Sequence, residues 1–279
     1  MKKYLALFLT MAMSVGVLAG CGGGTDETAT TDGADTAERT TFTVGFDAEY
    51  PPYGYKNDAG EYVGFDLDLA QEVCDRNGWE LIKQPIDWSS KDMELNSGTV
   101  DCLWNGFTMT GRESEYTFSE PYVDNSIVFV VRQDSDIQTK EDLAGKIVIT
   151  QAGSSALTAL TNTEDNDENL ALAATFASLE QTPDYNSAFM SLETGAVDAI
   201  AVDIGVAQYQ LTNHSDKFRQ LEEPLSTEQY AIAFKLGNEE LRDQVQATLD
   251  EMVEDGTFDA IAANYTDYNL DQMVCLGKE

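Results

Sequence analysis

Two short segments of the sequence carry polar side chains of opposite character, and each follows an apolar run typical of a strand. The segment "NGFTMTGRE" supplies hydroxyls and a cation through Thr108, Thr110 and Arg112. A lone carboxylate, Asp203, follows the second apolar run, "VDAIAV". Ligands of open α/β sheets bind beyond the carboxyl ends of the strands. A molecule that carries both a carboxylate and an ammonium, as a free amino acid does, would fit between these two sets of groups.

The same pattern precedes both sets. The stretches "LNSGTVDCL" at residues 95–103 and "LETGAVDAI" at residues 192–200 each read Leu-x-Ser/Thr-Gly-x-Val-Asp-x-Leu/Ile. In each, helix-compatible residues lead to a glycine, Gly98 or Gly195, suited to the left-handed position at which helices end. The apolar residues that follow have the pattern of a buried strand. One such unit is a common connection that could recur by chance, but the shared residues favour two α/β lobes of similar construction.

The other elements must position these groups, and they alternate between strands and helices. Apolar and β-branched runs predict strands at residues 41–46, at "SIVFVVRQDS" and at "KIVIT". A helix is predicted with Asp66 as its N-cap, and two more around the break at Asp255–Gly256. The apolar stripe of the first helix would consist of Leu67, Ala70, Val73 and Cys74. The order of elements predicts a second lobe inserted into the first, with crossings near residues 122–126 and 226–230.

The N-terminal residues have the features of a targeting segment. Lys2 and Lys3 precede an apolar run at residues 4–17 that is too short for a comfortable membrane span. The sequence "LAGC", ending at Cys21, resembles the lipobox of bacterial lipoproteins, in which this cysteine is acylated. Residues 1–21 are therefore predicted to be a lipoprotein signal peptide with Cys21 as the lipidation site. The alternative is an ordinary secretory signal that contains a cysteine by chance.

Composition excludes several classes of partner. Residues 22–40 contain no large apolar side chain, so they are expected to form a disordered tether before the folded part. The net charge of −34, from 16 Lys and Arg against 50 Asp and Glu, makes nucleic acid a poor partner. With His214 as the only histidine, neither a metal site nor a cofactor is expected. At most one disulfide is possible among the three cysteines beyond the signal peptide, Cys74, Cys102 and Cys275.

Several motifs in order resemble one family. The stretch "GFDLDLAQEVCDRN" resembles the signature of the solute-binding proteins for polar amino acids, which are the extracellular receptors of ABC importers. The stretches "WNGFTMTGRE", "FSEPY", "KEDLAGKIVITQAGS", "EQYAIAF" and "EDGTFDAIAANY" resemble the family's other landmarks, so the resemblance spans residues 41–268. It implies a two-lobed α/β fold of the type II periplasmic-binding-protein kind with two hinge crossings. The first lobe would comprise residues 41–124 and 228–279, and the inserted second lobe residues 125–227.

The resemblance also implies roles for individual residues of the first lobe. Three side chains would line its pocket: Asp47, Tyr50 and Trp88. Gly106 would give a backbone contact, Thr108 a hydroxyl and Arg112 a two-pronged grip on the α-carboxylate of an amino acid. The chain has one residue fewer between Thr108 and Arg112 than the family usually has, so the match of Arg112 includes a local deletion.

In the second lobe, the resemblance implies that Ser154 and Ser155 donate hydrogen bonds from the start of a helix. Asp203 would receive the α-ammonium group, and Gln151 would face the ligand's side chain. Simpler interpretations exist for some of these residues. Arg112 could pair on the surface with Glu113 or Glu115, Asp203 could cap the next helix, and Tyr50 and Trp88 could be core aromatics.

The function implied is capture of a free polar or cationic amino acid by lobe closure, followed by delivery to the permease subunits of an ABC importer. The protein would act as a monomer, held by its lipid anchor at the outer face of the cell membrane. The alternatives on the same fold are a dehydratase-type enzyme and a ligand sensor. The lone His214 is not near the motifs, which argues against a Ser-His-Asp or Cys-His arrangement.

Overall fold

The computed structural model describes residues 39–162 and 167–278, with only the backbone of Asp167. The predicted signal peptide at residues 1–21, including Cys21, and residues 22–38 of the predicted tether lie outside the described residues. Within the described part, no helix is long and apolar enough to cross a membrane. The described cysteines are free thiols.

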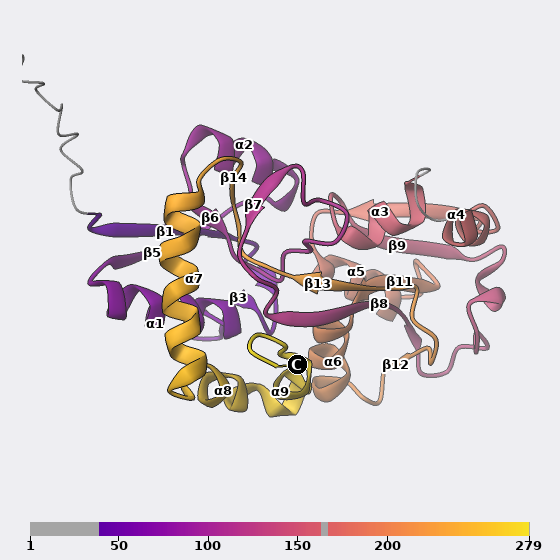
Figure 1. Cartoon of the computed structure of the whole chain (residues 1–279). Helices are drawn as coiled ribbons and strands as arrows, with labels where there is room; N and C mark the ends of the chain where they lie inside the picture. The colour runs from indigo at the N-terminus through magenta and orange to yellow at the C-terminus, as the bar shows by residue number, and fades with distance from the viewer. Residues whose placement is uncertain (1–38, 163–166, 279) are drawn as a thin grey trace, which may run out of the picture. The chain divides into compact units, whose positions relative to one another are not determined.

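The first sheet combines strands from both ends of the described chain (Figure 1). Its strand order is β5 (Glu80–Pro85), β1 (Thr41–Phe46), β6 (Cys102–Leu103), β14 (Ala233–Lys235) and β7 (Tyr116–Phe118). β1 lies parallel to β5 and β6, whereas β14 is antiparallel to β6 and β7. A small neighbouring sheet joins β2 (Glu49–Tyr50), β3 (Gly54–Lys56) and β4 (Tyr62–Val63).

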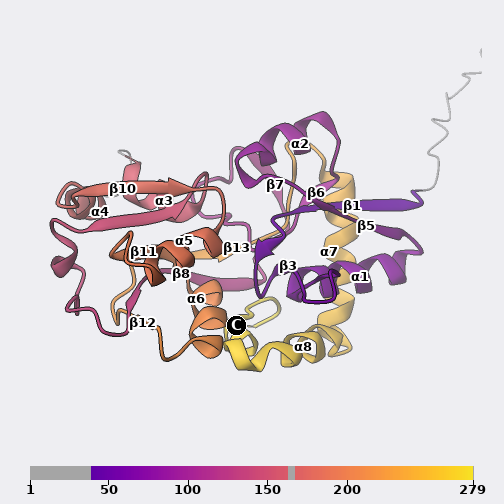
Figure 2. The ribbon, with the colours of Figure 1, turned by 180° about the vertical axis from the view of Figure 1, so that it is seen from behind.

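The second sheet is built from the middle of the chain (Figure 2). Its order is β10 (Ser178–Thr182), β9 (Ile147–Gln151), β11 (Ala199–Asp203), β8 (Val123–Arg132) and β12 (Phe218–Gln220), and β13 (Ser226–Tyr230) also pairs with β8. β9 is parallel to β10 and β11, so the carboxyl ends of these strands share one edge of the sheet. That edge carries Gln151 and Asp203.

The two segments predicted as crossings lie side by side. β8 and β13 pair antiparallel from Val123 opposite Tyr230 to Ile127 opposite Ser226. The chain enters the second sheet through β8 and returns through β13 to β14 of the first sheet (Figure 1). Polar side chains on this pair of strands therefore lie where the two sheets meet.

Helices cover both sheets. The helices that pack with the first sheet are α1 (Phe65–Asn77), α2 (Lys91–Ser97) and α7 (Glu239–Glu254), and α8 (Thr257–Ala262) packs against α1 and α7 (Figures 1 and 2). With the second pack α3 (Ser155–Thr161), α5 (Tyr185–Glu193) and α6 (Ile204–Asn213). The remaining short helices are η1 (Trp88–Ser90), η2 (Glu141–Leu143), α4 (Asp167–Ala173), η3 (Ala263–Tyr268) and α9 (Leu270–Met273).

The repeated motif forms the same unit in both sheets, as predicted. α2 ends at Ser97, its C-cap Gly98 has φ 78°, and β6 follows. α5 ends at Glu193 with Thr194 as its C-cap, the next residue Gly195 has φ 74°, and β11 follows. Each glycine takes the left-handed conformation that stops a helix at little steric cost.

The start of α1 differs from the prediction. The N-cap is Gly64, not Asp66, because the backbone must pass close to Tyr53 at that point. Gly64 has φ 137°, and a Cβ there would lie 2.2 Å from the Tyr53 carbonyl oxygen, so only glycine fits. Asp66 lies inside the first turn and is fully buried. The predicted apolar stripe of this helix is buried at Leu67, Ala70, Val73 and Cys74.

Candidate ligand-binding pocket

Nine of the ten residues predicted to contact a ligand line one small cavity, which we call the central pocket. They are Tyr50, Trp88, Gly106, Thr108, Arg112, Gln151, Ser154, Ser155 and Asp203. The cavity measures about 10 Å³, close to the least volume that holds one water molecule. Residues from segments next to the first sheet face residues from the carboxyl edge of the second, so the pocket lies where the sequence predicts a ligand site.

The tenth residue, Asp47, is not part of the cavity wall. It follows β1 and is buried, and its Oδ2 accepts a hydrogen bond of 2.6 Å from Gln151 Nε2. Its Oδ1 accepts from the Glu49 N–H at 2.9 Å. Burial raises the pKa of Asp47 to about 6, although these hydrogen bonds oppose the shift. Asp47 thus links the first sheet to Gln151 of the second and orients that amide.

Asp203 is buried and points its carboxylate at other side chains rather than at the helix that follows it. Oδ1 accepts from Tyr230 Oη at 2.6 Å and from Asn125 Nδ2 at 2.9 Å. Asp203 is the N-cap residue of α6, but its side chain makes no capping hydrogen bond. Burial raises the pKa of this carboxyl. The simple capping interpretation therefore does not describe the side chain of Asp203.

Arg112 offers free donors to the central pocket. Its guanidinium lies 5.1 Å from the centroid of the Phe107 ring, which is within the range of a cation–π contact. Within residues 39–162 and 167–278, this guanidinium has no ion pair and no hydrogen bond, so the surface pairing with Glu113 or Glu115 is not formed. A planar group with several N–H donors thus lines the same cavity as a buried carboxylate.

The aromatic residues of the pocket also belong to the apolar core. Tyr50 and Trp88 are 6% and 8% exposed, and each packs within a cluster of buried side chains. Gly106 lies between Tyr50 and Tyr230, and a Cβ at this position would come within 3.0 Å and 2.8 Å of their rings. With φ 57°, Gly106 has the left-handed backbone that favours glycine. Its N–H donates to Asp66 Oδ2 at 2.6 Å, which fixes the backbone at the pocket.

Sequence reasoning missed one acidic residue, Glu228. It lies on β13, and its Oε1 accepts hydrogen bonds from Thr108 Oγ1 at 2.6 Å and from Ser155 Oγ at 3.0 Å. A third bond comes from Asn125 Nδ2 at 2.9 Å. Burial, with a contribution from the negative charge of Asp203, raises the pKa of Glu228 to about 7. The available signal was an acid inside "STEQY", a strand predicted to run between the lobes.

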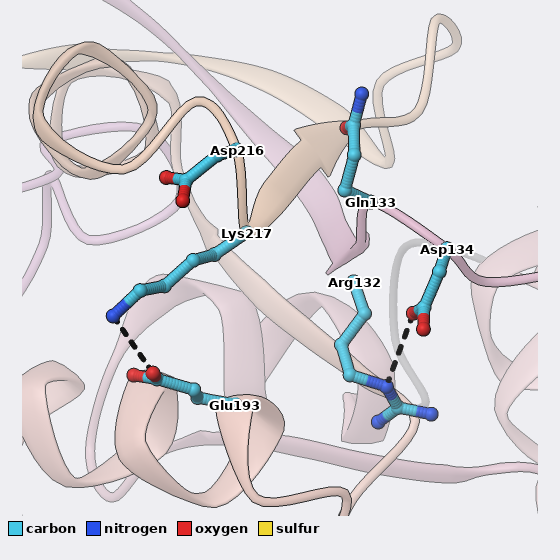
Figure 3. A pocket seen from close by; sticks show the side chains of 6 residues that line it. All are labelled: Arg132, Gln133, Asp134, Glu193, Asp216 and Lys217. Carbon is cyan, nitrogen blue, oxygen red and sulfur yellow. Dashed lines mark ion pairs between the residues drawn. The ribbon is translucent and has the colours of Figure 1, made fainter.

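A second, larger hollow of about 360 Å³ lies at the far end of β8 (Figure 3). It is lined by Arg132, Gln133, Asp134, Glu193, Asp216 and Lys217. Figure 3 shows Lys217 pointing at Glu193, with Nζ to Oε1 at 2.7 Å, and Arg132 directed at Asp134, at 3.8 Å. The cations here are paired within the protein, and Asp134 is 90% exposed. This arrangement has the character of a solvated surface.

The chain belongs to a known family. Residues 42–268 match the family described as bacterial extracellular solute-binding proteins, family 3. The L-cystine-binding protein TcyA of Bacillus subtilis is 30% identical over 276 residues, covering 95% of this chain and 97% of that protein. The ABC transporter glutamine-binding protein GlnH of the same organism is 29% identical over 273 residues, covering 94% and 96%.

Solved structures agree. A substrate-binding protein of an ABC uptake transporter from Streptococcus pneumoniae, with bound histidine, has a TM-score of 0.75 at 30% identity, covering 81% of this chain and 92% of that one. An ancestral arginine-binding protein bound to arginine has a TM-score of 0.74 at 32% identity, covering 82% and 99%. The predicted two-lobed α/β fold of type II is confirmed. Members of the family are solute-binding transport proteins that act outside the cytoplasm.

Proposed function

We propose that the protein captures a free amino acid with a polar or cationic side chain and delivers it to the permease subunits of an ABC importer. The observation that carries the proposal is a charge pair in the central pocket. Arg112, which has no ion pair or side-chain hydrogen bond among the described residues, and the buried Asp203 line one cavity from opposite sheets. An α-carboxylate would bind Arg112 and an α-ammonium would bind Asp203, so an amino acid would bridge the two sheets.

Capture requires motion, because the cavity is far smaller than an amino acid. We take residues 41–124 with 228–279 as one lobe and residues 125–227 as the other. Opening about β8 and β13 would separate Arg112 from Asp203, and closing would enclose the amino acid. The protein would act as a monomer, with a permease that recognises the closed form.

The proposal for side-chain preference rests on the groups around Gln151. Asp47 holds the Gln151 amide at one side of the pocket, and Tyr50 and Trp88 offer aromatic faces. Such a setting suits a polar or cationic side chain whose stem packs on a ring. Relatives named for cystine, glutamine, histidine and arginine support this class of ligand.

A thermal-unfolding screen of the twenty amino acids and cystine tests the function. A ligand at a hundred times its dissociation constant adds about 2.7 kcal/mol, or roughly 5–10 °C for a protein of this size. We expect such a shift with at least one of arginine, lysine, histidine, glutamine or cystine, and none with leucine or isoleucine. Mass spectrometry should recover the bound amino acid unchanged, whereas a dehydratase would convert it. Absence of a shift with every amino acid would contradict the proposal.

We also propose that Cys21 carries a lipid that anchors the protein to the outer face of the membrane. The support is the sequence "LAGC" after an apolar segment, followed by residues rich in small and polar side chains. Cys21→Ser should release the protein from the membrane fraction without lowering its unfolding midpoint, because Cys21 precedes the folded part. Fractionation of cells that express each form, with immunoblotting, measures this. A variant that still sediments with membranes would disprove the anchor.

A further inference from the structure

The carboxylate of Glu228 receives hydrogen bonds from three separate parts of the fold. Thr108 follows β6 of the first sheet, Asn125 is on β8, and Ser155 begins α3 beside the second sheet. All three donors converge on Oε1, and no hydrogen bond among the described residues uses Oε2. Glu228 is thus held firmly against two residues of the central pocket, with one oxygen left for another donor.

These bonds decide what the two pocket hydroxyls can do. A serine or threonine hydroxyl has one hydrogen to donate and two lone pairs that accept. The hydrogens of Thr108 and Ser155 are used on Glu228. Each hydroxyl therefore presents only lone pairs to the cavity, and a lone pair accepts from an ammonium but repels a carboxylate. This part of the pocket wall suits a cation.

The contacts of Asn125 also indicate that this part of the pocket wall suits a cation. Its Nδ2 donates to Asp203 Oδ1 and to Glu228 Oε1, each at 2.9 Å, so these two oxygens lie no farther apart than twice that distance. The two carboxylates also fix the orientation of the amide, because the reverse would turn its oxygen toward both. Asn125 Oδ1 is then a buried acceptor without a partner among the described residues.

We propose that Glu228 is a second carboxylate of the ammonium subsite, which acts with Asp203 on the α-ammonium group of a bound amino acid and holds Thr108 and Ser155 as acceptors. This inference rests on the proposed function of the central pocket. An ammonium has three N–H donors, and this subsite offers two carboxylates and two hydroxyl oxygens. The α-carboxylate is left to Arg112.

The number of protons released when an amino acid binds should show whether Glu228 accepts from the ammonium group. Burial, and to a lesser extent the charge of Asp203, raises the pKa of Glu228 to about 7, and burial raises that of Asp203. Tyr53, Tyr185 and Tyr230 also interact electrostatically with Glu228, and Arg112 lines the adjoining central pocket. An ammonium beside both carboxylates favours their ionised forms, so its binding at pH 7 should release protons. A ligand carboxylate beside Glu228 would instead cause proton uptake.

The test is titration calorimetry at pH 7 in phosphate and in Tris, with L-arginine, L-histidine, L-glutamine and L-cystine as probes. Buffers that differ in ionisation enthalpy reveal the number of protons released. Glu228→Gln keeps the shape and an oxygen for the three donors but removes the charge. We expect the wild type to release protons with its tightest probe, and the variant to bind that probe at least about tenfold more weakly with less release. The control is Glu222→Gln, which makes an equal charge change at an exposed residue between β12 and β13. This variant should bind the probe within twofold of the wild type.

The outcomes separate this inference from the function it rests on. If the wild type binds none of the twenty amino acids or cystine, the proposed function fails. If it binds a probe but Glu228→Gln binds equally well or more tightly, or if the wild type takes up protons, Glu228 is not an ammonium acceptor. The variant should unfold at or above the wild-type temperature in the absence of amino acid, because a buried charge is removed. Proton uptake by the wild type would contradict the proposal even if the variant folds poorly.

Discussion

Arg112→Ala and Asp203→Ala should each weaken amino-acid binding by at least roughly thirty-fold, while the protein stays folded. Each change leaves one charge of the bound zwitterion without its partner in a closed pocket, which costs about 2–5 kcal/mol. At about 1.4 kcal/mol per tenfold change, the expected loss is roughly thirty-fold to several-thousand-fold. Titration calorimetry with the tightest amino acid of the screen, together with thermal unfolding of each variant, measures both effects.

The controls for this prediction test chemistry as well as position. Arg112→Lys should recover little affinity, because an ammonium cannot make the planar two-pronged contact of a guanidinium. Glu113→Ala, next to Arg112 but exposed, should change affinity less than about threefold, and so should His214→Ala. Near-native affinity in Arg112→Ala would overturn the assignment of the carboxylate subsite.

The fold was predictable because its signals are local. A helix end, a left-handed glycine and a buried strand occur within nine residues of each repeat, as in "LNSGTVDCL". The start of α1 was not predictable in the same way, because it depends on a distant contact. The backbone of Gly64 passes the Tyr53 carbonyl so closely that no side chain fits, and Asp66 is drawn into the core by Tyr122 and the Gly106 N–H.

In the pocket, too, local sequence signals were predictable and contacts between distant residues were not. Residues after strand ends, such as Arg112 and Asp203, can be proposed from their order in the sequence, because parallel strands end at a common edge. Glu228 could not be assigned to the pocket in this way, because its partners Thr108 and Ser155 lie 120 and 73 positions away. An acid in a strand is also normally solvated. Asp47 was assigned to the pocket wall, but its carboxylate is used on Gln151, a partner 104 positions away.

The second large effect that we expect is on the stability of the fold, and it comes from the buried acid Asp66. It is fully buried, and its Oδ2 accepts from the Gly106 N–H at 2.6 Å and from Tyr122 Oη at 2.8 Å. Its Oδ1 has no partner within the described residues. Burial raises the pKa of Asp66 from 3.8 to about 7, against the effect of the two hydrogen bonds. The folded protein therefore holds this proton over a pH range in which the unfolded chain has released it.

Because the folded-state pKa is the higher one, the contribution of Asp66 to stability is fully present below about pH 4 and is lost as the pH rises through about 7. Asp66→Asn keeps an acceptor for Gly106 and Tyr122 without the charge. We expect the variant to match the wild type near pH 4.5 within about 1 kcal/mol, and to exceed it at pH 8 by on the order of 2–4 kcal/mol in free energy of unfolding. Urea unfolding at both pH values, followed by circular dichroism, measures the difference.

Asp75→Asn is the matched control, because Asp75 is on the same helix, is exposed and changes the net charge equally. It should shift the free energy of unfolding by less than about 0.5 kcal/mol at either pH. If Asp66→Asn is instead less stable than the wild type at pH 8, the ionised carboxylate is needed to hold Gly106 and Tyr122. In that case the charge of Asp66 stabilises the pocket backbone more than its burial costs, and amino-acid affinity should fall together with stability, since Gly106 lines the central pocket.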